Sequence, residues 1–149
     1  MPTCIFCDIV AGRAPASVAY EDDAILVIMD RYPLNPGHAL VLPKEHAATL
    51  PELAEETGMH LFRVAMRIDR SLRDSSLAAD AIRLTLSDGA TAGQEVPHVH
   101  LHVIPHYRGE ASGPLARARG ASRTRSATRE ELDDTARAIR EAYTRLYTG

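Results

Sequence analysis

Three histidines, His98, His100 and His102, stand two residues apart, and aliphatic residues fill the positions between them. Strict alternation of this kind is typical of a β-strand that buries one face, and it predicts a strand over residues 96–104, closed by Pro105. The three imidazoles would then share one face, backed by an apolar layer. Because imidazole transfers protons and attacks electrophiles near neutral pH, this face is a candidate catalytic surface.

The histidine row is open to three interpretations. Three surface histidines would need no function, although strand faces favour threonine, tyrosine or valine over histidine. A single metal held by all three rings is disfavoured by distance, since His98 and His102 would lie about 13 Å apart on a flat strand, whereas two adjacent rings could share a zinc. The third interpretation gives the histidines separate roles, in which His100 attacks a substrate and its neighbours orient or coordinate other groups.

The row lies inside a longer motif, GQEVPHVHLHVIP, that spans residues 93–105. This motif resembles the signature of the histidine triad superfamily of nucleotide hydrolases and transferases. The resemblance continues upstream through CIFC at residues 4–7, YEDD at 20–23 and DRYPLNPGH at 30–38. It leaves the residues beyond 106 outside.

The resemblance implies a two-step transfer at the α-phosphate of an adenosine nucleotide, either a phosphoramidate or a dinucleoside polyphosphate. His100 would be the nucleophile, forming a nucleotidyl-histidine that water then hydrolyses. Its second ring nitrogen must donate to a fixed acceptor, such as a backbone carbonyl, so that the attacking nitrogen keeps its lone pair. The resemblance also implies a purine nucleotide as partner and a homodimer, and it leaves the need for magnesium open.

The resemblance assigns five further residues to the nucleotide and its phosphate: Asp30, His38, Ser87, Gln94 and His102. The carboxylate of Asp30 would accept from the ribose hydroxyls, with a turn aspartate ahead of a Tyr-Pro pair as the alternative. His102 and Gln94 would contact the phosphate, and His38 would join the same network.

Three positions depart from the family pattern. Ser87 stands where many members carry asparagine, and a hydroxyl has one donor where an amide has two. Glu95 stands where several branches carry serine or threonine, so its carboxylate would repel a polyphosphate leaving group or favour an amine. His106 replaces an arginine that often follows the proline. If the changes at Ser87 and Glu95 disable turnover, the chain would be a catalytically weak module that binds a nucleotide or a nucleic-acid end.

The two cysteines, Cys4 and Cys7, form a Cys-x-x-Cys pair. Without a signal peptide or an apolar run near the roughly 20 residues of a membrane span, we expect a cytoplasmic protein that does not contact a membrane. In a reducing compartment the pair is a metal half-site, a buried pair without metal or a redox motif. Bacterial-type members of the superfamily resemble this chain in completing a zinc site with two histidines, here His46 and His98. Four protein ligands would make this zinc structural.

Five short apolar runs, over residues 18–21, 24–30, 39–43, 81–87 and 96–104, predict strands. A Pro-Leu-Asn-Pro-Gly turn joins the second and third runs as a hairpin. Between the third and fourth runs, apolar residues at helical spacing predict one main helix, opened by a capping box at Thr49 and Glu52. Strands gathered around one helix predict an α+β fold with an antiparallel sheet, and the resemblance agrees.

Within the main helix we expect Met59, Phe62 and Met66 to pack in the core, with a base pocket or a dimer seam as alternatives. His60 is expected to face solvent.

The chain divides into a nucleotide-binding domain over residues 1–107, an Arg-rich flexible linker over 108–129 and a helix over 130–149. The linker holds six arginines and one acid, Glu110, so it would clamp phosphates, touch nucleic acid weakly or remain solvated. We do not expect nucleic acid to be the main partner. Thr128 and Glu131 form a second capping box, and the helix that follows would bury its apolar stripe against the domain or a second subunit.

Overall fold

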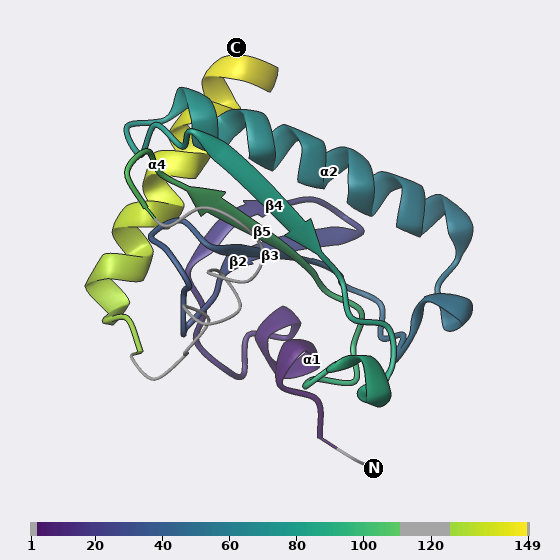
Figure 1. The fold of residues 1–149 in the computed structure, drawn as a ribbon. Coiled ribbons are helices and arrows are strands. Elements are labelled where there is room, and N and C mark those ends of the chain that lie inside the picture. The colour runs from purple at the N-terminus through teal and green to yellow at the C-terminus, as the bar shows by residue number, and fades with distance from the viewer. Residues whose placement is uncertain (1–2, 111–125, 149) are drawn as a thin grey trace.

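Five antiparallel strands form one sheet in the computed structural model, which describes residues 3–110 and 126–148 (Figure 1). The strands are β1 (Val18–Glu21), β2 (Ile25–Met29), β3 (Ala39–Pro43), β4 (Ala81–Thr85) and β5 (Leu101–His106). Their order across the sheet is β1-β2-β3-β5-β4. The predicted α+β fold with an antiparallel sheet, one main helix and a C-terminal helix is therefore confirmed.

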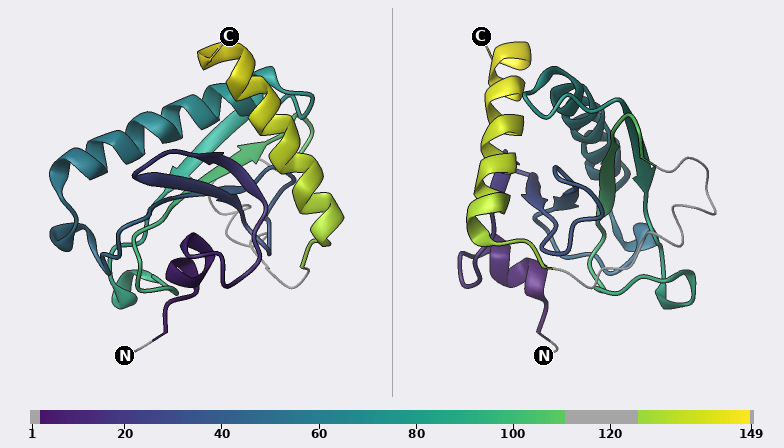
Figure 2. Two further views of the ribbon diagram at one scale, coloured as in Figure 1. Left: turned by 180° about the vertical axis from the view of Figure 1, so that it is seen from behind. Right: turned by 60° about the vertical axis from the view of Figure 1, so that its left-hand side comes forward.

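Helices cover both faces of the sheet (Figures 1 and 2). The long helices α2 (Glu55–Asp74) and α4 (Arg129–Tyr147) pack on one face, and the short α1 (Ile5–Val10) lies on the other. Two short 3₁₀ turns, η1 (Leu50–Glu52) and η2 (Ala90–Ala92), connect the elements. In the described parts of the chain, no helix is both long and apolar enough to cross a membrane.

The sequences of the two strands β2 and β3 are apolar without interruption because both faces of each strand are buried. Every residue of β2 and β3 is buried, because each strand contributes alternate side chains to two different cores. Val27 and Val41 point into the larger core beneath α2 and α4, whereas Ile28 and Leu40 point toward α1. The α1 side holds fewer buried side chains, which leaves room there for a cavity.

The predicted hairpin between the second and third strands is confirmed, with Met29 opposite Ala39 and Ile25 opposite Pro43. Gly37 ends the turn at a φ of 94°, a conformation that favours glycine. A Cβ at this position would come within 3.0 Å of Leu72 and 3.1 Å of Leu77. Glycine is therefore required here for its conformation and for the close approach of the α2 end.

The strand that carries the histidine row is shorter at its start and longer at its end than expected. β5 begins at Leu101, so His98 and His100 precede the hydrogen-bonded strand, and it continues through Pro105. Pro105 is tolerated because the pairing of β5 with β3 ends at Val103, so the side of β5 that faces β3 needs no N–H donor there. The alternation nevertheless holds, since Val99, Leu101 and Val103 all enter the larger core.

The main helix begins later than the capping box predicted. Thr49 precedes η1 rather than α2, and within the described residues its side chain makes no capping hydrogen bond. The carboxylate of Glu52 accepts from the backbone N–H of Ala48 at 2.8 Å instead. Leu53 adopts an extended backbone after η1, and this break moves the start of α2 to Glu55.

The last helix begins as predicted, because Thr128 accepts a hydrogen bond from the N–H of Glu131 at 3.1 Å. Its apolar stripe, including Leu132, Ala136 and Ile139, is buried in the same core as α2. The alternatives for this stripe are thus decided in favour of the domain itself. Residues 111–125, the larger part of the predicted flexible linker, lie outside the described residues.

Two expectations for α2 were wrong. Met59, Phe62 and Met66 do not pack in the core but are 70%, 50% and 59% exposed. They stand to one side of the buried row that includes Val64 and Ile68, so the helix carries an apolar flank outside its core face. His60 is not simply solvent-facing either, because its Nε2 lies 2.7 Å from the carboxylate of Asp22.

Candidate active site and metal centre

A cavity of about 760 Å³ opens on the α1 side of the sheet. Five of the residues predicted to bind or react with a nucleotide line it: Asp30, Ser87, Gln94, His100 and His102. The sixth, His38, is fully buried and contacts this group from below the surface. Residues from strands and loops far apart in sequence thus meet in one cavity.

His100 has the geometry of an imidazole with one free lone pair. Its Nδ1 lies 2.8 Å from the backbone carbonyl of His98, and because a carbonyl only accepts, Nδ1 must carry the hydrogen. Nε2 of the neutral ring then keeps its lone pair. The ring of Phe6 meets it edge-on with 5.0 Å between centroids and restrains its orientation.

Three groups form a directed hydrogen-bond chain below His100. The backbone N–H of Leu34 donates to Nδ1 of His38 at 3.0 Å, which places the hydrogen of a neutral His38 on Nε2. That Nε2 lies 2.9 Å from Nδ1 of His102 and donates to it. His102 in turn must carry its own hydrogen on Nε2. A backbone amide therefore fixes the tautomers of two successive histidines and makes His102 a donor.

Asp30 completes this chain. Its Oδ1 accepts from the N–H of Tyr32 at 2.8 Å, and its Oδ2 lies 3.4 Å from His38 Nε2. The first of these contacts is a turn of the kind that the alternative interpretation of Asp30 predicted. A carboxylate offers about four lone-pair directions, so these contacts leave capacity for further donors.

Gln94 is occupied by the backbone around it. Its amide nitrogen donates to the carbonyls of Ala48 and Val96 at 2.7 and 2.9 Å, and its Oε1 accepts from the N–H of Gly89 at 2.7 Å. Both amide hydrogens are therefore used in holding the loop that carries η2. The predicted contact from Gln94 to phosphate stays a prediction, and it requires one of these bonds to be exchanged.

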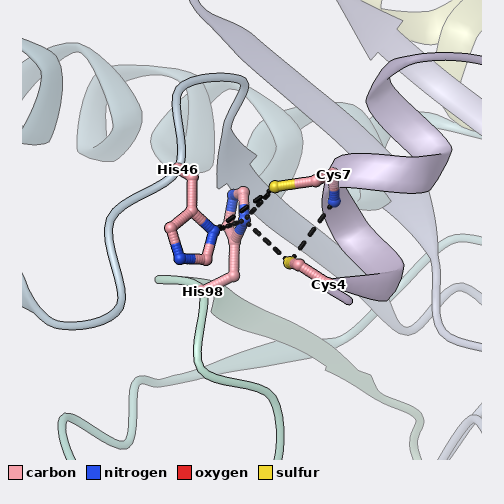
Figure 3. Close-up of side chains that lie close together, drawn as sticks. All are labelled: Cys4, Cys7, His46 and His98. Carbon is pink, nitrogen blue, oxygen red and sulfur yellow. Dashed lines mark hydrogen bonds between the residues drawn. The ribbon is translucent and has the colours of Figure 1, made fainter. Parts of the chain in front are cut away.

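The second cluster joins the residues predicted to hold zinc (Figure 3). Nδ1 of His98 lies 3.4 Å from Sγ of Cys4, 3.6 Å from Sγ of Cys7 and 3.2 Å from Nδ1 of His46. Cys7 Sγ is also 3.3 Å from His46 Nδ1. Four donor atoms from α1, the β3–η1 connection and the histidine row thus surround a common centre.

The hydrogen-bond partner of His98 decides what its ring can do there. Nε2 of His98 donates to the carbonyl of Pro43 at 2.7 Å, so Nδ1 directs a lone pair at the sulfur atoms and His46. Burial lowers the pKa of His98, helped by the neighbouring His46 and His100, and this favours the neutral ring that a metal requires. Burial and the adjacent Cys4 raise the pKa of Cys7. Two ring nitrogens and two thiols match the donor set of a tetrahedral metal site.

The two sites are connected through α1 and His98. Cys4 caps α1, accepting from the N–H of Cys7 at 3.4 Å, and Phe6 of the same helix packs against both His98 and His100. His98 also supplies the carbonyl that sets the tautomer of His100. Whatever holds the cluster together therefore also positions His100.

His106, the third departure from the family pattern, is buried at the far end of the cavity. Its Nδ1 lies 3.0 Å from the carboxylate of Glu110, and its Nε2 is buried without a hydrogen-bond partner among the described residues. Burial would raise the pKa of Glu110, but His106, the Tyr107 N–H and the Asn35 amide donate to it and hold that pKa below its usual value.

Sequence reasoning missed several lining residues: Phe6, Asn35, Arg83, Thr85, Glu110, Arg129 and Leu132. A pairing signal could have found two of them, because Thr85 stands opposite His102 and Arg83 opposite Ile104 in the β4–β5 ladder. The others come from different elements, which period-two counting along one strand does not reach.

Comparison with known proteins agrees with this arrangement. The family model described as HIT domain matches residues 11–109. An uncharacterized HIT-like protein of Mycobacterium tuberculosis is 42% identical over 139 residues, which is 93% of this chain and 92% of the relative. The chain belongs to the HIT family.

Two further comparisons bear on chemistry. A Zn-bound histidine triad family protein from Mycobacterium smegmatis has a crystal structure similar to this one, with a TM-score of 0.82, 35% identity and coverage of 98% of this chain and 96% of that chain. An Arabidopsis thaliana protein named adenylylsulfatase HINT3 is 36% identical over 68% of this chain and 51% of its own length.

Proposed function

We propose that this protein is a nucleotide hydrolase or nucleotidyl transferase that acts at the α-phosphate of a purine nucleotide through His100. The observation that carries the proposal is the 2.8 Å contact from His100 Nδ1 to the His98 carbonyl, since it leaves a lone pair on the other nitrogen of a ring that lines the cavity. Imidazole with one nitrogen so held is a nucleophile at neutral pH.

The reaction proceeds in two steps. The Nε2 lone pair forms a bond to the α-phosphorus, and the bond from phosphorus to the leaving group breaks, with the electron pair going to that group. The ring is then a cation, still holding its Nδ1 hydrogen against the His98 carbonyl. Water attacks the phosphorus and gives up a proton to solvent, the bond to nitrogen breaks with its electron pair returning to Nε2, and the neutral imidazole is restored.

The hydrogen-bond chain below His100 supports the charge that develops in both steps. Nε2–H of His102 is the donor for a non-bridging phosphate oxygen, and it requires no reorganisation because Leu34 and His38 fix its tautomer. Asp30, at the end of β2, accepts from the ribose hydroxyls and so favours ribonucleotides over deoxyribonucleotides.

The cluster of Cys4, Cys7, His46 and His98 holds a structural zinc in this proposal. The donor set and the mutual distances fit a tetrahedral ion, and a similar protein binds zinc. Zinc supplies a cross-link between α1 and the histidine row, and four protein ligands leave no coordination position for chemistry.

Glu95 is exposed at the cavity and faces the leaving group in this proposal. A carboxylate there disfavours a polyphosphate and tolerates an amine, so we propose adenosine phosphoramidate as a better substrate than diadenosine polyphosphates. The relative named an adenylylsulfatase makes adenosine 5′-phosphosulfate a third substrate to test.

The test is AMP release from these three substrates by the wild-type chain, by His100→Ala and by His60→Ala as a histidine control outside the cavity. We expect His100→Ala to abolish release and His60→Ala to retain it. Trapping a nucleotidyl adduct at His100 that survives base and is released by acid, as a bond from phosphorus to imidazole nitrogen should be, would add direct support. If wild type releases no AMP but binds it, the chain is the catalytically weak binding module instead.

We also propose a homodimer that pairs β4 with β4 of a second copy. Among residues 3–110 and 126–148, β4 is an outer strand whose free edge pairs with no other strand, and α4 covers one flank of α2, where Arg67 contacts Tyr143 and Tyr147. The other flank carries exposed Met59, Phe62 and Met66. A free strand edge beside an apolar helix flank is a surface that requires a partner, and a two-fold axis would satisfy both features at once.

Light scattering tests this dimer, comparing wild type with Phe62→Glu and with Arg137→Glu, an exposed arginine of α4 outside the apolar flank. We expect Phe62→Glu to yield monomers and Arg137→Glu to remain dimeric. A monomeric wild type would contradict the proposal.

A further inference from the structure

The strand β4 forms one wall of the nucleotide cavity. Arg83 and Thr85 stand two residues apart on it and both line the cavity, whereas Ile82 and Leu84 pack against the core beneath α2 and α4. Every residue of β4 pairs with β5, so this wall runs beside the strand that carries His102 (Figure 1). The sheet therefore presents two polar side chains of β4 next to the histidine row.

The register of the sheet places Thr85 beside His102. Thr85 is directly opposite His102 in the β4–β5 ladder, and Leu40 of β3 is opposite His102 on its other side. Side chains in such opposed pairs have Cβ atoms about 5 Å apart, so the Thr85 hydroxyl and the His102 ring share one stretch of the cavity wall. Leu40 is apolar and packs toward α1. A hydrogen-bond donor next to His102 in the sheet thus comes from β4 and not from β3.

Arg83 is the next residue along the same wall. It stands opposite Ile104, which makes it the diagonal neighbour of His102. Diagonal neighbours have Cβ atoms about 7–8 Å apart, a separation that a long side chain covers. The guanidinium of Arg83 can therefore reach a group that is bound at His102.

The protein itself leaves these two side chains unused. Among residues 3–110 and 126–148, neither the Thr85 hydroxyl nor the Arg83 guanidinium takes part in a hydrogen bond or an ion pair. The other two arginines of the cavity are engaged, since Arg129 donates to the hydroxyl of Ser17 at 2.8 Å and the Arg31 guanidinium lies 5.7 Å from the centroid of the neighbouring tyrosine ring. Arg83 is thus the arginine of this cavity that is available to a bound anion.

We infer that Thr85 and Arg83 form a second side of the phosphate site, next to His102. The Thr85 hydroxyl donates to one non-bridging oxygen of the α-phosphate, and Arg83 donates to another and balances its negative charge. Both contacts strengthen as charge gathers on these oxygens during the transfer. The inference rests on the proposed function, which puts the α-phosphate at His100 and His102, and adds two residues that hold it.

Calorimetric titration with AMP and with adenosine tests the inference, because the two ligands differ by the phosphate alone. In wild type we expect AMP to bind more tightly than adenosine. Thr85→Val keeps the shape of the side chain and loses the hydroxyl, so it should weaken AMP binding by about tenfold, as expected for a hydrogen bond to a charged group, and leave adenosine binding unchanged. Arg83→Gln removes the charge and should also weaken AMP binding by at least about tenfold without an effect on adenosine.

Thr144→Val and Arg137→Gln are the matched controls, since both residues are exposed on α4 beyond its first turn. They should leave both affinities unchanged. A wild-type ratio of AMP to adenosine affinity in either β4 variant, or an equal loss for both ligands, would overturn the inference and leave the nucleotide site intact. If wild type binds neither ligand, or binds AMP no more tightly than adenosine, the proposed function itself fails.

Discussion

Two clusters in this molecule hold the same kinds of residues and differ in what they can do. Cys4, Cys7, His46 and His98 place their donor atoms within 4.8 Å of one another, and so do Asp30, His38 and His102. By composition and spacing alone, both are candidate metal sites.

The backbone decides between them. At His98 a carbonyl, that of Pro43, takes the hydrogen of Nε2 and leaves Nδ1 as a lone pair pointing to the cluster. At His38 an N–H, that of Leu34, donates to Nδ1 and forces the hydrogen onto Nε2, where it points into the cluster. The nitrogen that faces the cluster can ligate a cation in His98, whereas in a neutral His38 it carries a hydrogen and donates. His98 and His38 thus differ in role because a backbone carbonyl accepts from one ring and a backbone N–H donates to the other.

Removing a ligand from the first cluster should have the largest effect. We expect Cys7→Ser to lose the zinc measured by elemental analysis in wild type, and to lower the melting temperature by about 10 °C, the effect of losing a tightly bound ion. Activity should fall too, because His98 holds the tautomer of His100. Asp30→Asn, in the second cluster, should keep the zinc. A wild type without zinc, whose melting is unchanged by a chelator, would contradict this assignment.

A substitution in the second cluster, formed by Asp30, His38 and His102, should lower activity without changing the zinc content. We expect His38→Ala to reduce kcat/KM by about tenfold to a hundredfold, as for other residues that orient a contacting group, while the zinc content stays constant. ¹⁵N NMR of the histidine rings reports which ring nitrogen carries the hydrogen, and a general loss of structure would not change this selectively at His102. In wild type His102 should carry its hydrogen on Nε2, and in His38→Ala this preference should disappear. An unchanged His102 tautomer would show that His38 does not control it.

Asp22 and His60 form a carboxylate–histidine pair outside both clusters, and they serve as a comparison for the effect of such a pair on stability. Burial would raise the pKa of Asp22, but the Tyr20 hydroxyl, His60 and the N–H groups of Ala24 and Ile25 donate to it and lower that pKa to about 2. The lowered value contributes about 2 kcal/mol of stability above the ordinary pKa of 3.8, and this is lost as pH falls from about 4 toward 2.

Asp22→Asn should therefore destabilise the protein by about 2 kcal/mol at pH 7 and by much less near pH 2. Urea unfolding at several pH values measures this, with Asp88→Asn as a carboxylate control. Equal destabilisation by Asp22→Asn at both pH values would mean that packing, rather than charge, explains the loss.

Much of the fold was predictable from the sequence because it depends on near neighbours. The five strands, the hairpin at residues 33–37 and the cap at Thr128 each follow from a local pattern. The start of α2 was not predictable, because the capping box at Thr49 and Glu52 formed the 3₁₀ turn η1 instead. Neither was the exposure of Met59, Phe62 and Met66, since an apolar residue at helical spacing does not reveal which flank has a partner.

Residue types and spacing were enough to indicate the histidine row and the family resemblance, and that resemblance in turn indicated the four metal-ligand candidates, because these depend on which side chains the chain carries and in what order. The tertiary structure alone decided the tautomers of His38, His98 and His102, the approach of Phe6 to His100, and the arrival of Arg129 at the cavity. A lone pair or a hydrogen at a ring nitrogen is set by whichever group lies within about 3 Å of the other nitrogen. For His98 that group is the carbonyl of Pro43, 55 residues away in the chain. A local sequence pattern does not predict a contact over that separation.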